Sequence, residues 1–347
     1  MDPLAVAVAV LPVFAFLGGL VFLDGYKLVS GRRIALSVLF GAGAALLCWG
    51  LASLVFRLGG PFADLYAKAL LPLVEESAKA LPVIVLIRRR RLGFTVDAAI
   101  VGFAVGAGFS LVENAWYLAA MPDRNLAVWL LRGFGTALLH GTNTLVVAVA
   151  ARCLADLRPG LGSAVCLPGL VTAWAVHAVY NLGWLPPAAA SALLIFGLPV
   201  LAGAVFLRSE AMLHRWLGEG MDHDVARLRE ITSGHFSSTP SGQFLRQVAR
   251  TFPPETVVDI HCYLRVWLEL SIRAKGDLLR KEAGLPVEPD PAVADKLREL
   301  KALERSIGRA GLRALAPILP RTSRDFWQIH QLESGAGGVT GGCGPWA

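Results

Sequence analysis

The sequence predicts an all-α membrane protein, a polytopic bundle of about seven transmembrane helices followed by a C-terminal helical cytoplasmic domain. The chain of 347 residues is 55% hydrophobic and 17% charged, with a mean hydropathy of +0.55, whereas soluble domains contain about 25% charged residues. Apolar runs of about 20 residues, enough to cross a bilayer, recur along residues 1–208. Residues 209–347 hold 17 of the 26 acidic residues, which is typical of a soluble part.

These observations divide the chain into three parts. We expect a transmembrane domain at residues 1–208, a cytoplasmic helical domain at residues 209–333 and a glycine-rich, disordered tail at residues 334–347. The five cysteines have no paired spacing, so neither a disulfide framework nor a cysteine-based metal site is expected.

The predicted spans follow the apolar runs in order. The first run has no basic n-region and no clear cleavage site, so we expect a retained transmembrane helix rather than a cleaved signal. Glycine and proline interrupt the chain between most of the runs. The seven runs are at residues 4–23, 34–56, 65–87, 95–119, 126–150, 162–185 and 188–207.

Basic residues predict the orientation in the membrane. Alternate loops, at residues 24–33, 88–94 and 151–161, contain nine lysines and arginines. The other loops contain mainly Arg57 and Arg124, so the positive-inside rule places the N-terminus outside and residues 209–347 in the cytoplasm. Arg132 lies near the outer end of its span, where its side chain can reach the interface. The positive charge therefore indicates contact with the lipid bilayer and argues against binding of nucleic acid.

The C-terminal part has helical runs with an apolar face. They cover about residues 242–251, 255–283, 291–316 and 321–333, and the third has Leu297, Leu300, Leu303 and Ile307 at helical spacing. We expect a small helical bundle that regulates the protein or recruits a cytoplasmic partner.

Ionisable side chains lie well inside four of the apolar runs. A charge in hydrocarbon costs about 2.5–3.5 kcal/mol on insertion scales, so such groups face a polar interior and meet partners. Measured from the outer end of each span, they lie roughly 10–20 Å deep, although successive helices run in opposite directions. One shared site is therefore expected from Glu75, Glu76 and Lys79 on the third span, Glu113 on the fourth, His140 on the fifth, and His177 and Asn181 on the sixth.

These residue types suit the attack of water on an amide carbonyl. A carboxylate of the Glu75–Glu76 pair can take a proton from water. Two histidines and a glutamate form a ligand set used by catalytic zinc sites; alternatively, the histidines polarise water without a metal. Asn181 shares a helix face with His177 and can donate to a developing oxyanion.

The motifs resemble those of the PrsW family of intramembrane proteases, which is related to CAAX prenyl endopeptidases and bacteriocin-processing membrane proteases. The family pattern E-E-x-x-K is matched at residues 75–79, and F-x-x-x-E at residues 109–113. His140 and His177 match the histidines on two later helices. The last element is often H-x-x-x-D, whereas here His177 is followed by Asn181, which still donates and accepts hydrogen bonds.

The resemblance implies a membrane-embedded endopeptidase that cuts membrane-anchored proteins, with anti-sigma factors as one kind of substrate. Zinc or another divalent metal held by Glu113, His140 and His177, or else a water activated by a glutamate, would supply the chemistry. Two alternatives stay open. A proton- or ion-coupled transporter would use the same groups as a relay, and an inactive family member would serve as a scaffold. Geometry distinguishes them, because a protease needs these groups around one cavity.

Overall fold

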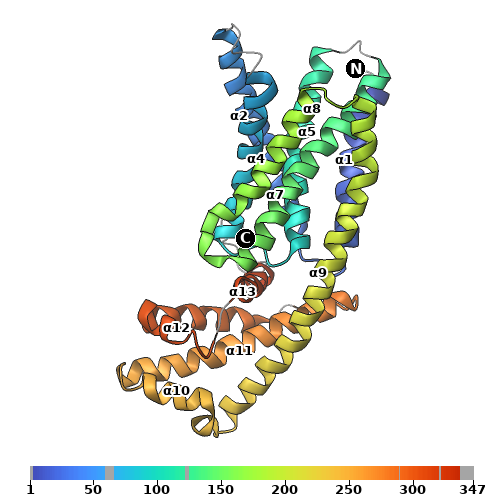
Figure 1. The fold of residues 1–347 in the computed structure, drawn as a ribbon. Coiled ribbons are helices and arrows are strands. Elements are labelled where there is room, and N and C mark those ends of the chain that lie inside the picture. The colour runs from blue at the N-terminus through green and yellow to red at the C-terminus, as the bar shows by residue number, and fades with distance from the viewer. Residues whose placement is uncertain (1–2, 59–65, 122–124, 289, 320–321, 337–347) are drawn as a thin grey trace. The chain divides into compact units, whose positions relative to one another are not determined.

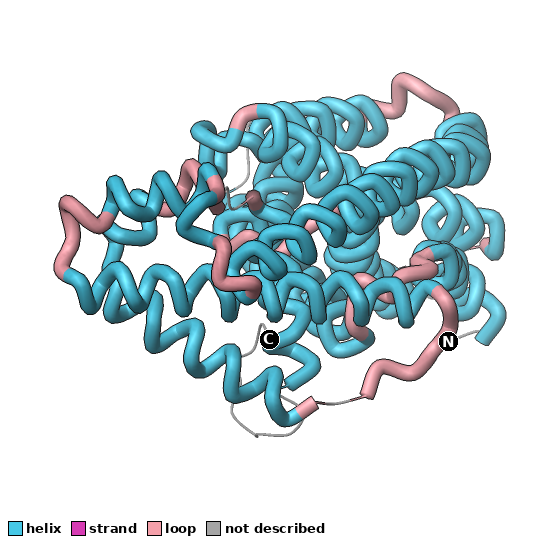
Figure 2. Tube along the Cα trace, turned by 90° about the horizontal axis from the view of Figure 1, so that it is seen from below, coloured by secondary structure: helices cyan, strands magenta, loops and turns pink. Residues whose placement is uncertain are grey.

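The computed structural model describes residues 3–58, 66–121, 125–288, 290–319 and 322–336. The described residues form helices joined by turns and contain no strand (Figures 1 and 2), which confirms the predicted fold class. The chain divides into two compact units, Met1–Ser209 and Glu210–Ala347. The domain roles and the orientation in the membrane stay predictions. Residues 59–61 and 122–123, which we expected to separate two pairs of spans, lie outside the described residues. Most of the expected tail at residues 334–347 lies outside them as well.

The first unit contains the apolar helices. Within the described residues, six helical segments are long and apolar enough to cross a membrane. The charged α4, which with η1 covers the predicted run at residues 65–87, is not among these six. The elements of this unit are α1 (Pro3–Leu23), α2 (Gly31–Leu58), η1 (Tyr66–Leu70), α4 (Leu71–Arg88), α5 (Thr95–Ala120), α6 (Leu126–Leu131), η2 (Arg132–Ala137), α7 (Leu138–Leu157), η3 (Pro159–Cys166), α8 (Leu167–Asn181) and the beginning of α9 (Pro187–Thr232).

Helix α5 lies at the centre of this unit, and glycines allow its neighbours to approach. A Cβ atom on Gly106 would lie 2.2 Å from the carbonyl oxygen of His140 on α7, and one on Gly108 would lie 1.9 Å from that of Val38 on α2. A residue with a Cβ atom does not fit at such distances, so both positions require glycine. Small residues at membrane helix interfaces permit this close packing. Helix α5 is not interrupted at these glycines. Their role is to let α7 approach so closely that His140 lies against α5.

The start of α5 is fixed by the buried side chain of Asp97. Its carboxylate accepts hydrogen bonds from the backbone N–H groups of Gly93, at 2.7 Å, and Phe94, at 3.0 Å. These donors precede the first helical turn, where a carboxylate also interacts favourably with the helix dipole. Arg152 of α7 donates to the Gly93 carbonyl at 3.1 Å, so the same loop fixes α7 relative to α5.

The second unit is a helical bundle around α11. Tyr263 and Trp267 of α11 are buried, and Leu297, Leu300 and Ile307 of α12 are buried in the same core, which confirms the apolar face predicted for that helix. Helix α9 extends to Thr232, well beyond the predicted end of the last apolar run. The other elements are η4 (Phe236–Ser238), α10 (Pro240–Val248), α11 (Pro254–Glu282), α12 (Pro291–Ala314) and α13 (Ser323–Ala336).

Candidate active site

Glu76 joins three helices of the first unit. It is fully buried, and its Oε1 accepts hydrogen bonds from Lys79 Nζ at 2.7 Å, His177 Nδ1 at 2.8 Å and Asn143 Nδ2 at 3.3 Å. These donors come from α4, α8 and α7. Among the described residues, none donates to Oε2 of Glu76. Asn143 was not among the predicted site residues, although an asparagine three residues after His140 inside an apolar span is a usable signal.

Both ring nitrogens of His140 are engaged. Lys79 Nζ lies 2.9 Å from Nδ1, and Glu113 Oε2 lies 2.7 Å from Nε2. A lysine ammonium only donates and a carboxylate only accepts, so a neutral His140 accepts at Nδ1 and donates from Nε2. The ring also packs against Phe109, with centroids 4.9 Å apart. Thus Phe109 and Glu113, one helical turn apart on α5, both fix the position of His140.

Arg132 holds Glu113 from the other side. Its NH2 lies 3.1 Å from Glu113 Oε1, its Nε donates to Asn114 Oδ1 at 3.0 Å, and its guanidinium carbon lies 3.7 Å from the centre of the Tyr117 ring. Asn114 in turn donates to the carbonyl of Ala9 on α1 at 2.8 Å. The arginine that we expected to reach the membrane interface instead pairs with a predicted site residue.

Glu75 faces His177. Its Oε2 lies 3.7 Å from His177 Nε2. Because Nδ1 of this ring donates to Glu76, Nε2 carries the lone pair in the neutral form. Among the described residues, Glu75, His140 and His177 each offer one ligand atom, and the three atoms lie within 4.8 Å of one another. Glu113, the carboxylate predicted as a ligand, contacts His140 but is not part of this group.

Two π-helical segments precede the helices that carry these residues. η1 leads directly into α4 with its Glu75–Glu76 pair, and η2 leads into α7 with His140. π-Helical turns are rare and are frequent at functional sites. The wider turn of η2 changes the angle between Arg132 at its start and His140 beyond its end. Periodicity in the sequence did not predict that these two side chains reach the same carboxylate.

Asn181 lies apart from this cluster. It is the last residue of α8, and it is exposed. No described residue forms a hydrogen bond with its side chain in this structure. The role that we expected for it, donation to an oxyanion, stays a prediction.

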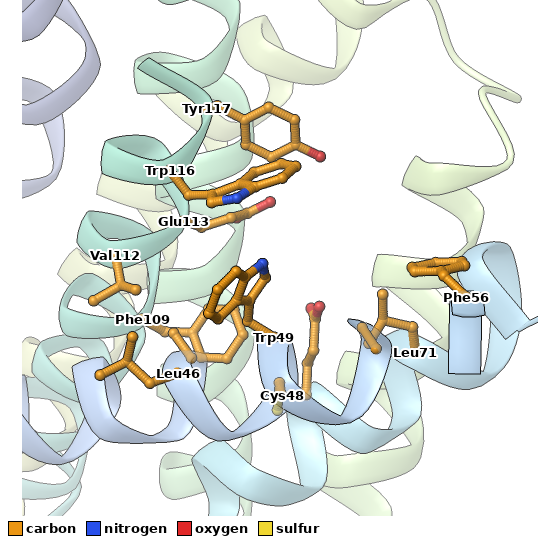
Figure 3. A pocket seen from close by; sticks show the side chains of 13 residues that line it. Leu46, Cys48, Trp49, Phe56, Leu71, Phe109, Val112, Glu113, Trp116 and Tyr117 are labelled. Atoms are coloured by element: carbon orange, nitrogen blue, oxygen red, sulfur yellow. The ribbon is translucent and has the colours of Figure 1, made fainter. Parts of the chain in front are cut away.

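The cluster opens onto an apolar cavity of about 390 Å³ between α2, α4 and α5. Thirteen side chains line it, and Glu75 and Glu113 are the acidic ones among them. Figure 3 shows Trp49 below Glu113 and Trp116 beside it, with Leu71 and Phe56 across the open space. The polar groups that the sequence placed at similar depth therefore meet beside one cavity. A relay would instead string them along a path across the bilayer.

Comparison with known proteins agrees with this arrangement. Residues 31–207, half of the chain, match the family described as PrsW family intramembrane metalloprotease. This range covers α2 to α8, which supply all the residues of the cluster, and it leaves the second unit outside. No curated protein and no solved structure matches the chain. Because the family match spans half of the sequence, the chain belongs to the PrsW family of intramembrane metalloproteases.

Proposed function

We propose that this protein is an endopeptidase that hydrolyses peptide bonds of membrane-anchored proteins, with Glu75 as the carboxylate that takes a proton from the attacking water. The observation that carries the proposal is the convergence of Glu75, His140 and His177 in one group, of which Glu75 lines an apolar cavity. Such a cavity suits substrates that are membrane proteins and whose anchors enter from the lipid. The family resemblance suggests anti-sigma factors as one kind of substrate.

The donor set fits a divalent metal. Two imidazoles and a carboxylate are the protein ligands of many catalytic zinc sites, which keep a further position open. The Nδ1–H group of His177 donates a hydrogen bond to Glu76 Oε1, an arrangement that orients metal-binding histidines. His140 would free Nδ1 as a ligand by giving up its contact with Lys79, while Nε2 keeps its contact with Glu113. Zinc, or another divalent ion held by Glu75, His140 and His177, would supply a Lewis acid beside the carbonyl.

Glu75 is the carboxylate best placed to handle protons. Both oxygens of Glu113 are engaged, by Arg132 and by His140, and Glu76 is fully buried. Glu75 is partly exposed and lines the cavity, and its two oxygens allow one to join the ligand set while the other accepts a proton. As water adds to the carbonyl carbon, Glu75 takes its proton. It returns that proton to the amide nitrogen as the C–N bond breaks.

The remaining residues position these groups. Glu76 holds one nitrogen of His177, and Lys79 holds Glu76. Arg132 holds Glu113, and Glu113 holds His140. Such partners fix ring orientation, and their loss typically costs about 10–100-fold in metal affinity or activity.

Reconstitution tests the function and the metal together. Purified protein in lipid vesicles is expected to cleave a fluorogenic membrane-anchored substrate and to contain about one equivalent of metal. A chelator should abolish cleavage, and added zinc should restore it. His177→Ala is expected to lose the metal, whereas His214→Ala, at an exposed position in the second unit, should retain it. Chelator-resistant cleavage by metal-free protein would contradict the metal assignment, and no cleavage of any membrane-anchored substrate would contradict the function.

Glu113→Gln distinguishes a positioning residue from a metal ligand. We expect the variant to keep its equivalent of metal while activity falls by about 10–100-fold, because glutamine weakens the contact with His140 but leaves the three-atom group intact. Metal analysis and kcat/KM are measured on the same preparation. Glu210→Gln, at an exposed position, is the matched control. Complete loss of the metal from Glu113→Gln would instead support the ligand set predicted from the sequence.

A further inference from the structure

We propose that the cavity between α2, α4 and α5 is the substrate subsite beside the scissile bond, that it takes a bulky apolar side chain, and that Trp49 and Trp116 set its size limit. The proposal rests on the proposed function, because it assumes that the peptide bond is attacked at Glu75. It assigns a substrate class and two specificity-determining residues to a cavity that the catalytic cluster only borders.

The position of the cavity makes it a subsite. Glu75 and Glu113 lie in its wall, and their carboxylates reach His177 and His140 within 3.7 Å and 2.7 Å. A peptide bond held at Glu75 therefore has its neighbouring side chains at this cavity. The volume of about 390 Å³ lies within the range of pockets that enclose ligands, about 300–1,000 Å³.

The lining selects an apolar occupant. The cavity is lined mainly by hydrocarbon, from residues such as Ala45, Leu46 and Leu71. The exceptions are the two glutamates, Cys48, and the hydroxyl and ring nitrogens of the aromatic residues. A charged side chain would lose its hydration there without a full set of partners. A large apolar side chain gains about 25 cal/mol for each Å² that it buries.

Charge complementarity favours a peptide over a phospholipid. The acidic groups in the wall repel a lipid phosphate, whereas the N–H groups of an extended peptide can donate to a carboxylate. Backbone amides in a bilayer must find partners once a helix is opened. Glu75, whose contact with His177 is long at 3.7 Å, offers acceptor capacity at the wall of the cavity.

Trp49 and Trp116 limit the space. They are 54% and 46% exposed, and the Trp116 ring packs edge-on against Tyr117 with centroids 4.7 Å apart. Among the described residues, part of each tryptophan side chain is therefore left uncovered and available to a substrate. Figure 3 shows the Trp116 indole above Glu113 and the Trp49 indole below it, with Phe56 across the open space. Replacing either indole by alanine enlarges the subsite without removing a group from the catalytic cluster.

A substrate series tests the inference. Membrane-anchored peptides that differ only in the residue next to the cleavage site, alanine, leucine, phenylalanine or tryptophan, are compared by kcat/KM, and the cut is located by mass spectrometry. Wild type should favour leucine or phenylalanine over alanine. Trp49→Ala and Trp116→Ala should shift the preference toward tryptophan by about 10-fold or more, the size of effect that one pocket group typically has on discrimination. Trp184→Ala, at a 73% exposed tryptophan that does not line the cavity, should keep the wild-type ranking.

A capture experiment gives a second, activity-independent measurement. In the Glu75→Gln background, a photo-crosslinking residue at position 56 should capture the peptide, and the same residue at position 184 should not. If wild type cleaves but both tryptophan variants keep its ranking, the subsite assignment is overturned. Capture of phospholipid instead of peptide at position 56 overturns it as well. If wild type cleaves no peptide while position 56 still captures it, the proposed function fails and the binding site stands.

Discussion

Glu75→Gln is expected to lower kcat/KM for a membrane-anchored substrate by at least about 100-fold. Glutamine keeps the size of the side chain but removes both the proton acceptor and the charged oxygen proposed as a metal ligand. Proton transfer by a positioned side chain alone contributes about 10²–10⁴-fold to a rate. Glu75 is the cavity-lining carboxylate that faces His177, so we expect no other described carboxylate to replace it. The loss should appear mainly in kcat, because the apolar lining that binds the substrate is unchanged.

Controls separate a chemical defect from a folding defect. The unfolding transition of Glu75→Gln in detergent should match that of wild type, since Glu75 is partly exposed and lacks the buried partners of Glu76. Glu210→Gln, a matched change at an exposed glutamate, should retain full activity. An active Glu75→Gln enzyme would remove Glu75 from the reaction and would move the proton acceptor to Glu76 or Glu113.

Lys79→Met is expected to lower the free energy of unfolding by about 3–5 kcal/mol. Lys79 is fully buried, donates to Glu76 Oε1 at 2.7 Å, lies 2.9 Å from His140 Nδ1, and its Nζ is 4.7 Å from the centre of the Phe109 ring. Methionine fills a similar volume but leaves the Glu76 carboxylate buried without its cation. That uncompensated charge, rather than a cavity, is the source of the destabilisation. Denaturant unfolding in detergent micelles measures it.

The double variant Glu76→Gln/Lys79→Met tests this explanation. Removing both charges should recover part of the loss, because the neutral amide can still meet His177 and Asn143, and neighbouring residues in one network couple by about 0.5–3 kcal/mol. Lys27→Met, at an exposed lysine between α1 and α2, should change stability by less than about 0.5 kcal/mol. Wild-type stability in Lys79→Met would show that Glu76 does not depend on this lysine.

The sequence alone predicted most of the first unit because the bilayer imposes strong constraints. A charge inside a 20-residue apolar run is costly enough that Glu75, Glu76, Lys79 and Glu113 had to face partners, whatever the packing. Residues three apart in a helix share a face, and Lys79 does meet Glu76. Comparable depth further predicted that His140 and His177 belong to the same site, and their rings lie 5.0 Å apart.

The sequence did not predict where α9 ends or how the segment from α6 to α7 is divided. The helix α9 continues beyond its apolar run because polar residues sustain a helix as readily as apolar ones, so hydropathy did not reveal where it ends. The divided segment α6–η2–α7 has the composition of one uninterrupted span. Its π-helical turn is a matter of backbone hydrogen bonding, which has no signature in residue type.

The sequence by itself determined which ionisable residues must avoid lipid, and hence that Glu75, Glu76, Lys79, Glu113, His140 and His177 belong to one cluster. Only the tertiary structure decided how they pair: Glu75 rather than Glu113 completes the group of three with His140 and His177, and Arg132 turns inward to Glu113. Glu76 and His177, for example, are separated by 101 residues along the chain. Their contacts depend on the rotation of each helix about its axis. That rotation is set by packing contacts between helices, such as that of Gly106 against His140. The spacing of residues within one helix cannot encode such contacts.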